Sequence, residues 1–248
     1  MWRDISKIFL IVFHIALLPA LCKGANNLII KGDSLYNQSK WTEAYNSYLN
    51  LFDASQTYTP NMLLKMAYIS GKNGDLANQL YYLCTLYRHH PSKKVLKKIE
   101  AISDEYGLQG YRYSDIEYFI SVYKQHYDSI LIALIIISLV FCSNLIWKKW
   151  KNQKLSFRPI VFLLFLAFLY FVSNYSLIPP RAIINKNYCL IMEEPSAGSD
   201  IKTIVNKGHR ITLFGKQDIW YLVNWEGNRY YIKETDLYII PESHPYLF

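Results

Sequence analysis

The side chains that could attack a substrate or hold a metal are few and scattered in these 248 residues. Cys84 lies close to His89 and His90, but a metal site needs more ligands than this segment supplies. A Cys/His hydrolase built on Cys189 and His209 would need a larger domain with its nucleophile on a helix. The sequence also lacks a phosphate loop, a dinucleotide-binding glycine turn and a serine nucleophile elbow. We therefore expect no enzymatic activity, no metal and no cofactor.

Two apolar runs occupy the middle of the chain, Ser129–Trp147 and Ile160–Ile178. Each has nineteen residues without Lys, Arg, Asp or Glu. A helix of that length reaches roughly 28 Å, close to the hydrocarbon thickness of a bilayer. Between the runs, residues 148–158 carry no acid and five positive charges, from Lys148, Lys149, Lys151, Lys154 and Arg158. Because short basic loops stay in the cytoplasm, the pattern predicts transmembrane helices at 129–147 and 160–178, joined by a cytoplasmic loop.

The N-terminal residues 1–24 are typical of a secretory signal peptide. Met1–Lys7 is short and net positive, Ile8–Leu21 is apolar, and small residues follow. An uncleaved anchor and a lipidated Cys22 are alternatives that the sequence leaves open. Together with the hairpin, this segment predicts a protein of the bacterial inner membrane with two spans, whose two large flanks are periplasmic.

The formal net charge of +8 does not indicate a nucleic-acid partner. Residues 1–24 contribute +2 and residues 148–158 contribute +5, whereas residues 25–147 carry +1 and residues 159–248 are neutral. The excess therefore serves targeting and topology, and it leaves no basic face for nucleic acid on the exported flanks.

Residues 25–110 predict a domain of paired helices. Apolar residues recur at spacings of three and four, with a tight helix–helix turn at Asn37–Lys40. A second pair is expected at Asn61–Ser70 and Asp75–His90, followed by a capping helix at Ser92–Tyr106.

An internal repeat with an offset of 35 residues relates the two helix pairs. Small residues in one helix let its partner approach closely, and a larger side chain fills the space behind. The matched positions are Gly32, Ala44 and Tyr48 in the first pair and Ala67, Gln79 and Leu83 in the second, which Pro91 closes. The pattern resembles tetratricopeptide repeats, although Gln79 replaces a small residue and the first pair lacks a closing proline. The resemblance implies a concave face that binds a peptide or another protein; a helical bundle without a partner is the alternative.

Residues 111–128 predict an amphipathic segment before the first span. Ile116, Phe119, Ile120 and Tyr123 share one helical face. We expect this segment to lie at the membrane surface or to continue the first span.

Residues 181–241 change to short β-branched and aromatic runs separated by turn residues, which predicts a small all-β barrel of five or six strands. Trp220 and Tyr231 lie in two of these runs. We interpret them as core side chains, with a ligand-binding face as the alternative.

The turns of this barrel resemble those of the bacterial SH3-like domain. Glu194-Pro195-Ser196 and Lys207-Gly208 are followed, in the same order and spacing as in that family, by Asp218–Val223 and Glu226–Ile232. Tyr230-Tyr231-Ile232 departs from the family, which favours Gly-Trp-Val at that place, so a ligand groove around this strand is in doubt.

The order of signal peptide, helical repeats, membrane hairpin and SH3-like barrel is similar to that of the BatE-type proteins of the Bacteroidota aerotolerance operons. The resemblance implies a multi-domain membrane protein that acts as a non-catalytic adaptor or scaffold in an envelope complex. Its partners would be other envelope or membrane proteins, such as the von Willebrand A-domain proteins of these operons, besides the lipid bilayer. A membrane-anchored module whose barrel binds peptidoglycan peptide is the alternative.

Overall fold

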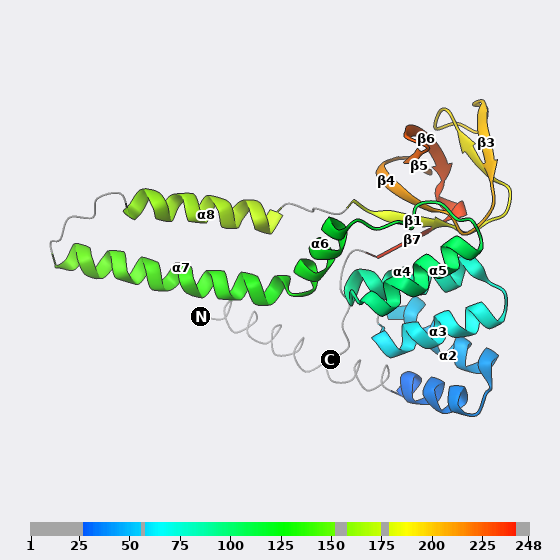
Figure 1. Cartoon of the computed structure of the whole chain (residues 1–248), viewed down its shortest axis with the longest axis horizontal. Helices are drawn as coiled ribbons and strands as arrows, with labels where there is room; N and C mark the ends of the chain where they lie inside the picture. Colours follow the sequence, from blue (N-terminus) through cyan, green and yellow to red (C-terminus); the bar gives the residue numbers. More distant parts are fainter. Residues whose placement is uncertain (1–26, 56–57, 152–157, 175–178, 242–248) are drawn as a thin grey trace, which may run out of the picture. The chain divides into compact units, whose positions relative to one another are not determined.

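The computed structural model describes residues 27–55, 58–151, 158–174 and 179–241, so the expected signal peptide at 1–24 lies outside it. The described part combines α-helices with a seven-stranded antiparallel sheet (Figure 1). It divides into two compact units. The helix–sheet unit comprises the described residues up to Arg88, Ser92–Tyr111 and those from Pro180 onward; the hairpin unit comprises His89–Pro91 and Arg112–Pro179.

The helical part of the helix–sheet unit consists of residues 27–37, α2 (Trp41–Ser55), α3 (Pro60–Lys72), α4 (Leu76–His89) and α5 (Lys93–Glu105). Capping side chains fix two of the starts. Thr59 Oγ1 accepts a hydrogen bond from Met62 N at 3.2 Å, and Ser92 Oγ accepts one from Lys94 N at 3.3 Å. The helices expected at 61–70, 75–90 and 92–106 are confirmed to within two residues.

The sheet contains β1 (Arg181–Ile184), β2 (Cys189–Met192), β3 (Ile201–Val205), β4 (Arg210–Gln217), β5 (Trp220–Trp225), β6 (Asn228–Lys233) and β7 (Leu237–Ile239). Its order is β3-β2-β6-β5-β4-β1-β7, and the 3₁₀ helix η1 (Glu234–Asp236) connects β6 to β7. Buried residues from all these strands gather in one cluster, so the sheet curls around a single core. The sequence analysis did not predict the three-residue edge strand β7.

The sheet is fastened to the chain that leaves α5. Gln109 O accepts a hydrogen bond from Arg210 N at 3.1 Å, and the Tyr111 hydroxyl donates to Gly208 O at 2.6 Å. Gly110 has a φ of +87°, and a Cβ there would overlap the Arg210 carbonyl group. We call these contacts between residues 109–111 and 208–210 the clamp.

The clamp joins two segments that the sequence predicts as separate domains. Apart from His89–Pro91, the described parts of residues 25–110 and 181–241 group by their contacts into one compact unit. Tyr111, expected in the juxtamembrane segment, is 1% exposed and lies in this unit. A second contact between helices and sheet pairs the rings of Tyr81 on α4 and Tyr238 on β7, whose centroids are 5.3 Å apart.

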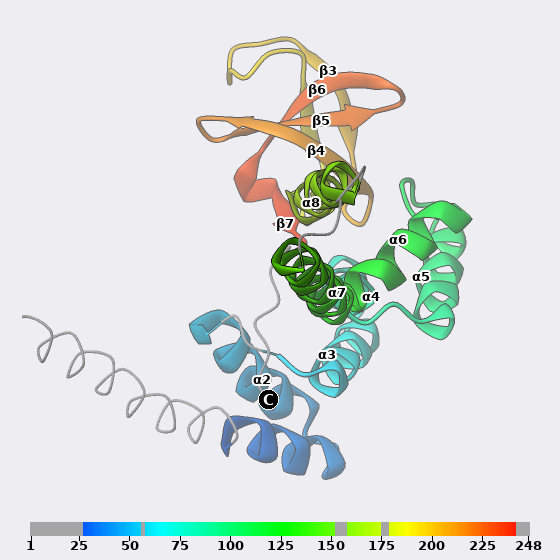
Figure 2. The same ribbon diagram turned by 90° about the vertical axis from the view of Figure 1, so that its left-hand side faces the viewer.

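The hairpin unit contains α6 (Asp115–Gln125), α7 (Tyr127–Trp150) and α8 (Arg158–Asn174). Helices α7 and α8 run side by side in opposite directions (Figures 1 and 2), and the rings of Phe141 and Phe162 stack at 5.5 Å. Among the described residues, α7 is the one helix long and apolar enough to cross a membrane. The expected second span at 160–178 begins within α8, but its last residues lie outside the described part.

The basic segment at 148–158 is helical where it begins. Lys148 and Lys149 lie in the last turn of α7 and Lys151 caps it, where positive charge is favourable to the carbonyl end of a helix. Arg158 is the first residue of α8, and Lys154 lies outside the described residues. On the expected apolar face of α6, Ile116 and Phe119 are 71% and 70% exposed, whereas Ile120 and Tyr123 are half-buried.

Candidate protein-binding surface

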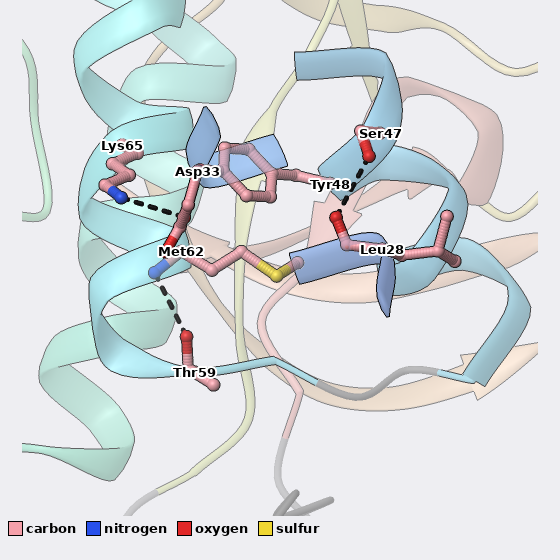
Figure 3. Close-up of polar contacts among 7 residues, drawn as sticks. All are labelled: Leu28, Asp33, Ser47, Tyr48, Thr59, Met62 and Lys65. Atoms are coloured by element: carbon pink, nitrogen blue, oxygen red, sulfur yellow. Dashed lines mark hydrogen bonds and ion pairs between the residues drawn. The ribbon is translucent and has the colours of Figure 1, made fainter. Parts of the chain in front are cut away.

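The first helix pair is built around Gly32 and Tyr48. The Tyr48 ring lies where a Cβ on Gly32 would be, so only glycine permits this approach of residues 27–37 to α2. The Tyr48 hydroxyl donates to Asp33 Oδ1 at 2.5 Å, and Asp33 also pairs with Lys65 on α3 at 2.8 Å (Figure 3). Burial, and then the Asp33 carboxylate, raises the pKa of the Tyr48 hydroxyl. These contacts fix residues 27–37, α2 and α3 relative to one another.

In the second helix pair, different residues allow the two helices to approach each other closely. Ala67 and Leu83 are buried, as is Ala44 in the first pair. The Gln79 side chain is accommodated between these helices because its amide lies over Gly71. A Cβ on residue 71 would overlap that amide. The structure thus brings Gly32 and Tyr48 into contact, whereas the close approach in the second pair involves Gly71, one helical turn beyond Ala67. Pro91 is half-buried between α4 and α5.

Three aromatic rings and two lysines form a surface over the first three helices. The rings of Tyr36, Trp41 and Tyr68 are in mutual edge contact, with centroids 4.9, 5.7 and 6.1 Å apart. Lys72 Nζ lies 4.8 Å from the Trp41 ring centroid and 5.5 Å from that of Tyr68, and Lys65 Nζ lies 5.1 Å from that of Tyr36. Together with Leu64, we call these residues the aromatic–lysine surface.

This surface combines exposed apolar area with unneutralised positive charge. Leu64 and Tyr68, one turn apart on α3, are each 45% exposed. Asp33 is engaged by Lys65, and no acidic side chain in the described ranges forms an ion pair with Lys72. Exposed aromatic and apolar side chains supply contact area, and the lysine favours an acidic group on whatever binds.

The sequence analysis did not find this surface. Its residues were counted toward helical periodicity, which does not separate the buried face of a helix from a partly exposed one. A usable signal is present: Lys65, Tyr68 and Lys72 recur at spacings of three and four on one helix face, where a solvated face would carry no large ring.

In the sheet, Trp220 is 8% exposed, and Tyr231 is half-buried between its neighbours Leu222 on β5 and Met192 on β2. Trp220 lies at the start of β5, outside the central cluster. The tryptophan within that cluster is Trp225, which the sequence analysis did not single out.

Within the described part of the chain, no group of three or more His, Cys, Asp and Glu side chains could hold a metal ion. Cys189 is fully buried, and this burial raises the pKa of its thiol to about 12, so it is protonated near neutral pH. His89, the last residue of α4, is 1% exposed.

Comparison with known proteins gives no assignment: no family model matches this chain, and neither a curated protein nor a solved structure is detectably similar to it.

Proposed function

We propose that this chain is a non-catalytic adaptor of the bacterial inner membrane, held by two spans, that recruits a protein partner through its aromatic–lysine surface. The observation that carries the proposal is the exposed, positively charged aromatic patch on a helix pair. The partner would be another envelope or membrane protein presenting an acidic group beside an apolar side chain. A Bat-type envelope complex is the setting that the domain order favours.

The fold assignments behind this proposal rest on particular contacts. The Gly32–Tyr48 approach lies at the positions that define the 35-residue repeat, which supports tetratricopeptide-like packing. Pro195-Ser196 falls in the connection between β2 and β3, Lys207-Gly208 between β3 and β4, and Gly227 between β5 and β6. These placements support an SH3-like barrel, because turns in the expected order join the expected strands.

The chain segments that make up the helix–sheet unit support two membrane crossings. This unit contains chain from before α6 and from after α8, and the clamp joins the two through buried side chains. Both segments must therefore lie on the same side of any membrane. If α7 crosses the membrane, the chain has to cross back before it reaches the sheet. In the order of the chain, α8 is the apolar helix that follows α7 and precedes the sheet.

Labelling of introduced cysteines tests the topology. On a background without native cysteines, a cysteine at Asn152 should resist a membrane-impermeant thiol reagent in cells with a permeabilised outer membrane. A cysteine at Ser199 should react. The proposed topology fails if residue 152 labels and residue 199 does not.

Site-specific photocrosslinking tests the binding role. A photoreactive residue at Leu64 should capture a discrete partner in native membranes, and the same residue at Asn50, exposed on α2, should not. Tyr68→Ala combined with Lys72→Glu should abolish capture at position 64 without lowering the amount of protein in the membrane. Equal capture at both positions, or capture that survives the double substitution, rules out this surface.

A further inference from the structure

A pocket lies where the end of the helical part meets the sheet. Its volume is about 400 Å³, within the range of small-ligand sites. One wall comes from Leu76 at the start of α4 and from the residues that follow α5, and the other from the β1–β2 and β3–β4 turns. Besides two leucines, it is lined by Tyr106, Asn187, Tyr188, Asn206, Lys207 and His209.

The clamp holds the two walls of this pocket together. Gln109 N donates a hydrogen bond to His209 Nδ1 at 3.1 Å, next to the bond from Arg210 N to Gln109 O. Leu108 packs against Gly208, where a Cβ would come within 3.2 Å of its side chain. The pocket is thus formed before any ligand arrives, which reduces the entropic cost of binding.

The polar groups of the pocket are mainly hydrogen-bond donors. Lys207 brings a positive charge, and no acidic residue is among the described side chains that line the pocket. Asn187 Oδ1 accepts the Lys207 backbone N–H at 3.4 Å, which leaves the Asn187 amide nitrogen as a donor. Because His209 Nδ1 accepts from Gln109, the neutral ring carries its proton on Nε2.

Tyr188 is the last residue of the β1–β2 turn, and its ring is open to solvent. Its φ is +56°, in the left-handed region that bulky residues avoid, and its side chain is 76% exposed. Tyr106, on the opposite wall, is 58% exposed. Strained and exposed side chains of this kind occur at ligand sites, where the ligand supplies the contacts that the protein lacks.

We propose that this pocket binds the C-terminal carboxylate of a peptide. Among the described residues that line the pocket, Lys207 is the one lysine and there is no arginine, so its single charge balances a carboxylate and leaves a doubly charged phosphate half-neutralised. The asparagine amides can pair with peptide groups, and the two tyrosine rings can cover the terminal side chains. The site is separate from the aromatic–lysine surface. The same chemistry is offered by a protein C-terminus with L-residues and by a cell-wall peptide ending in D-alanine.

Titration of short peptides against the full chain in lipid nanodiscs, followed by ligand-observed NMR, tests the proposal. The probes are acetylated tri-alanine and the same peptide with two terminal D-alanines, each as the free acid and as the amide. We expect the free acid of one of the two peptides to bind at least about tenfold more tightly than the amide of the same peptide. A single charge-assisted hydrogen bond to the carboxylate accounts for a difference of this size. Lys207→Gln should remove that preference, whereas Lys72→Glu should not. The preferred stereochemistry then identifies the source.

In these titrations, equal binding of acid and amide would overturn the proposal, as would the lack of saturable binding at millimolar peptide. A second pair of variants separates binding from folding. Tyr188→Gly relieves the positive φ and removes the ring, so affinity should fall while the melting temperature stays the same or rises. Asp218→Gly relieves a similar φ of +53° at a turn outside the pocket and should leave affinity unchanged. Full affinity in Tyr188→Gly would also contradict the proposal.

Discussion

The cores of the helical and sheet parts of the helix–sheet unit differ in their buried side chains. The helical core combines aliphatic residues such as Met62, Leu63 and Leu80 with tyrosine hydroxyls: Tyr48 donates to Asp33, and the hydroxyls of Tyr45 and Tyr82 share a hydrogen bond of 2.8 Å. The largest fully buried side chains of the sheet are isoleucines, Ile183, Ile184, Ile191 and Ile232. Hydrogen bonds between buried hydroxyls require particular orientations, whereas burial of aliphatic side chains depends mainly on area.

This difference indicates where each part is sensitive. In the first helix pair, an aromatic ring lies over a glycine and hydroxyl groups are held in fixed orientations. The stability of the helical part should therefore fall strongly when volume or charge is added there, or when its tyrosines ionise. The sheet should respond mainly to loss of apolar area. The clamp joins the two parts, so damage to it should separate their unfolding.

The largest effect is expected from a charge placed between the helices. Ala44 is completely buried in α2, so Ala44→Arg forces a cation and a long side chain into a packed interface. We expect the free energy of unfolding of the helical part to fall by on the order of 4 kcal/mol. Thermal melts of the detergent-solubilised chain, followed by far-UV circular dichroism, measure this loss.

Ala101→Arg is the control, because Ala101 lies on the exposed face of α5. Its melt should match that of the wild type. If Ala44→Arg melts like Ala101→Arg, the packing at Gly32, Ala44 and Tyr48 does not hold the helical part together.

An intermediate effect is expected at the clamp. In Gly110→Ala, the new Cβ meets the Arg210 carbonyl group and also requires a positive φ, for a combined cost of about 2–3 kcal/mol. Gly107→Ala has the same kind of backbone, with a φ of +61°, but open space around the Cβ, so about 1 kcal/mol is expected. Urea titrations of both variants provide the comparison. Equal losses would mean that the clamp does not couple helices to sheet.

Single ionisable groups have the smallest effect near neutral pH, because their contribution to stability changes only at high pH. Burial first, and then Tyr45, raises the pKa of the Tyr82 hydroxyl above its ordinary value of 10.0. Above pH 10 the unfolded chain therefore releases a proton that the folded chain retains, and stability falls as pH rises. In the sheet, the Cys189 thiol is raised from 9.0 to about 12, so its loss of stability begins near pH 9.

Denaturant midpoints measured from pH 7 to 12 distinguish these contributions. Cys189→Ala should flatten the decline that begins near pH 9, and Tyr82→Phe should flatten only the part above pH 10. A decline that is identical in both variants and in the wild type would show that neither group governs the alkaline stability of its region.

Local features of the sequence were sufficient to predict the positions of the helices and of most strands. Thr59 before Pro60, and Ser92 before a basic run, mark helix starts, because a hydroxyl that accepts a backbone N–H is a short-range interaction. The apolar composition at 129–147 similarly indicates α7 without reference to any neighbour.

What the sequence determined by itself was therefore the type of each segment: helix pairs, an apolar membrane-length helix with basic residues at its end, and short strands with their turns. Tertiary structure alone decided that residues 109–111 lie on residues 208–210, about one hundred positions away. It also decided which rings of the helical part remain exposed beside lysines, and that a pocket opens at the junction. Such contacts join residues whose own segments are already satisfied, so no local pattern of hydrophobicity or capping reveals them.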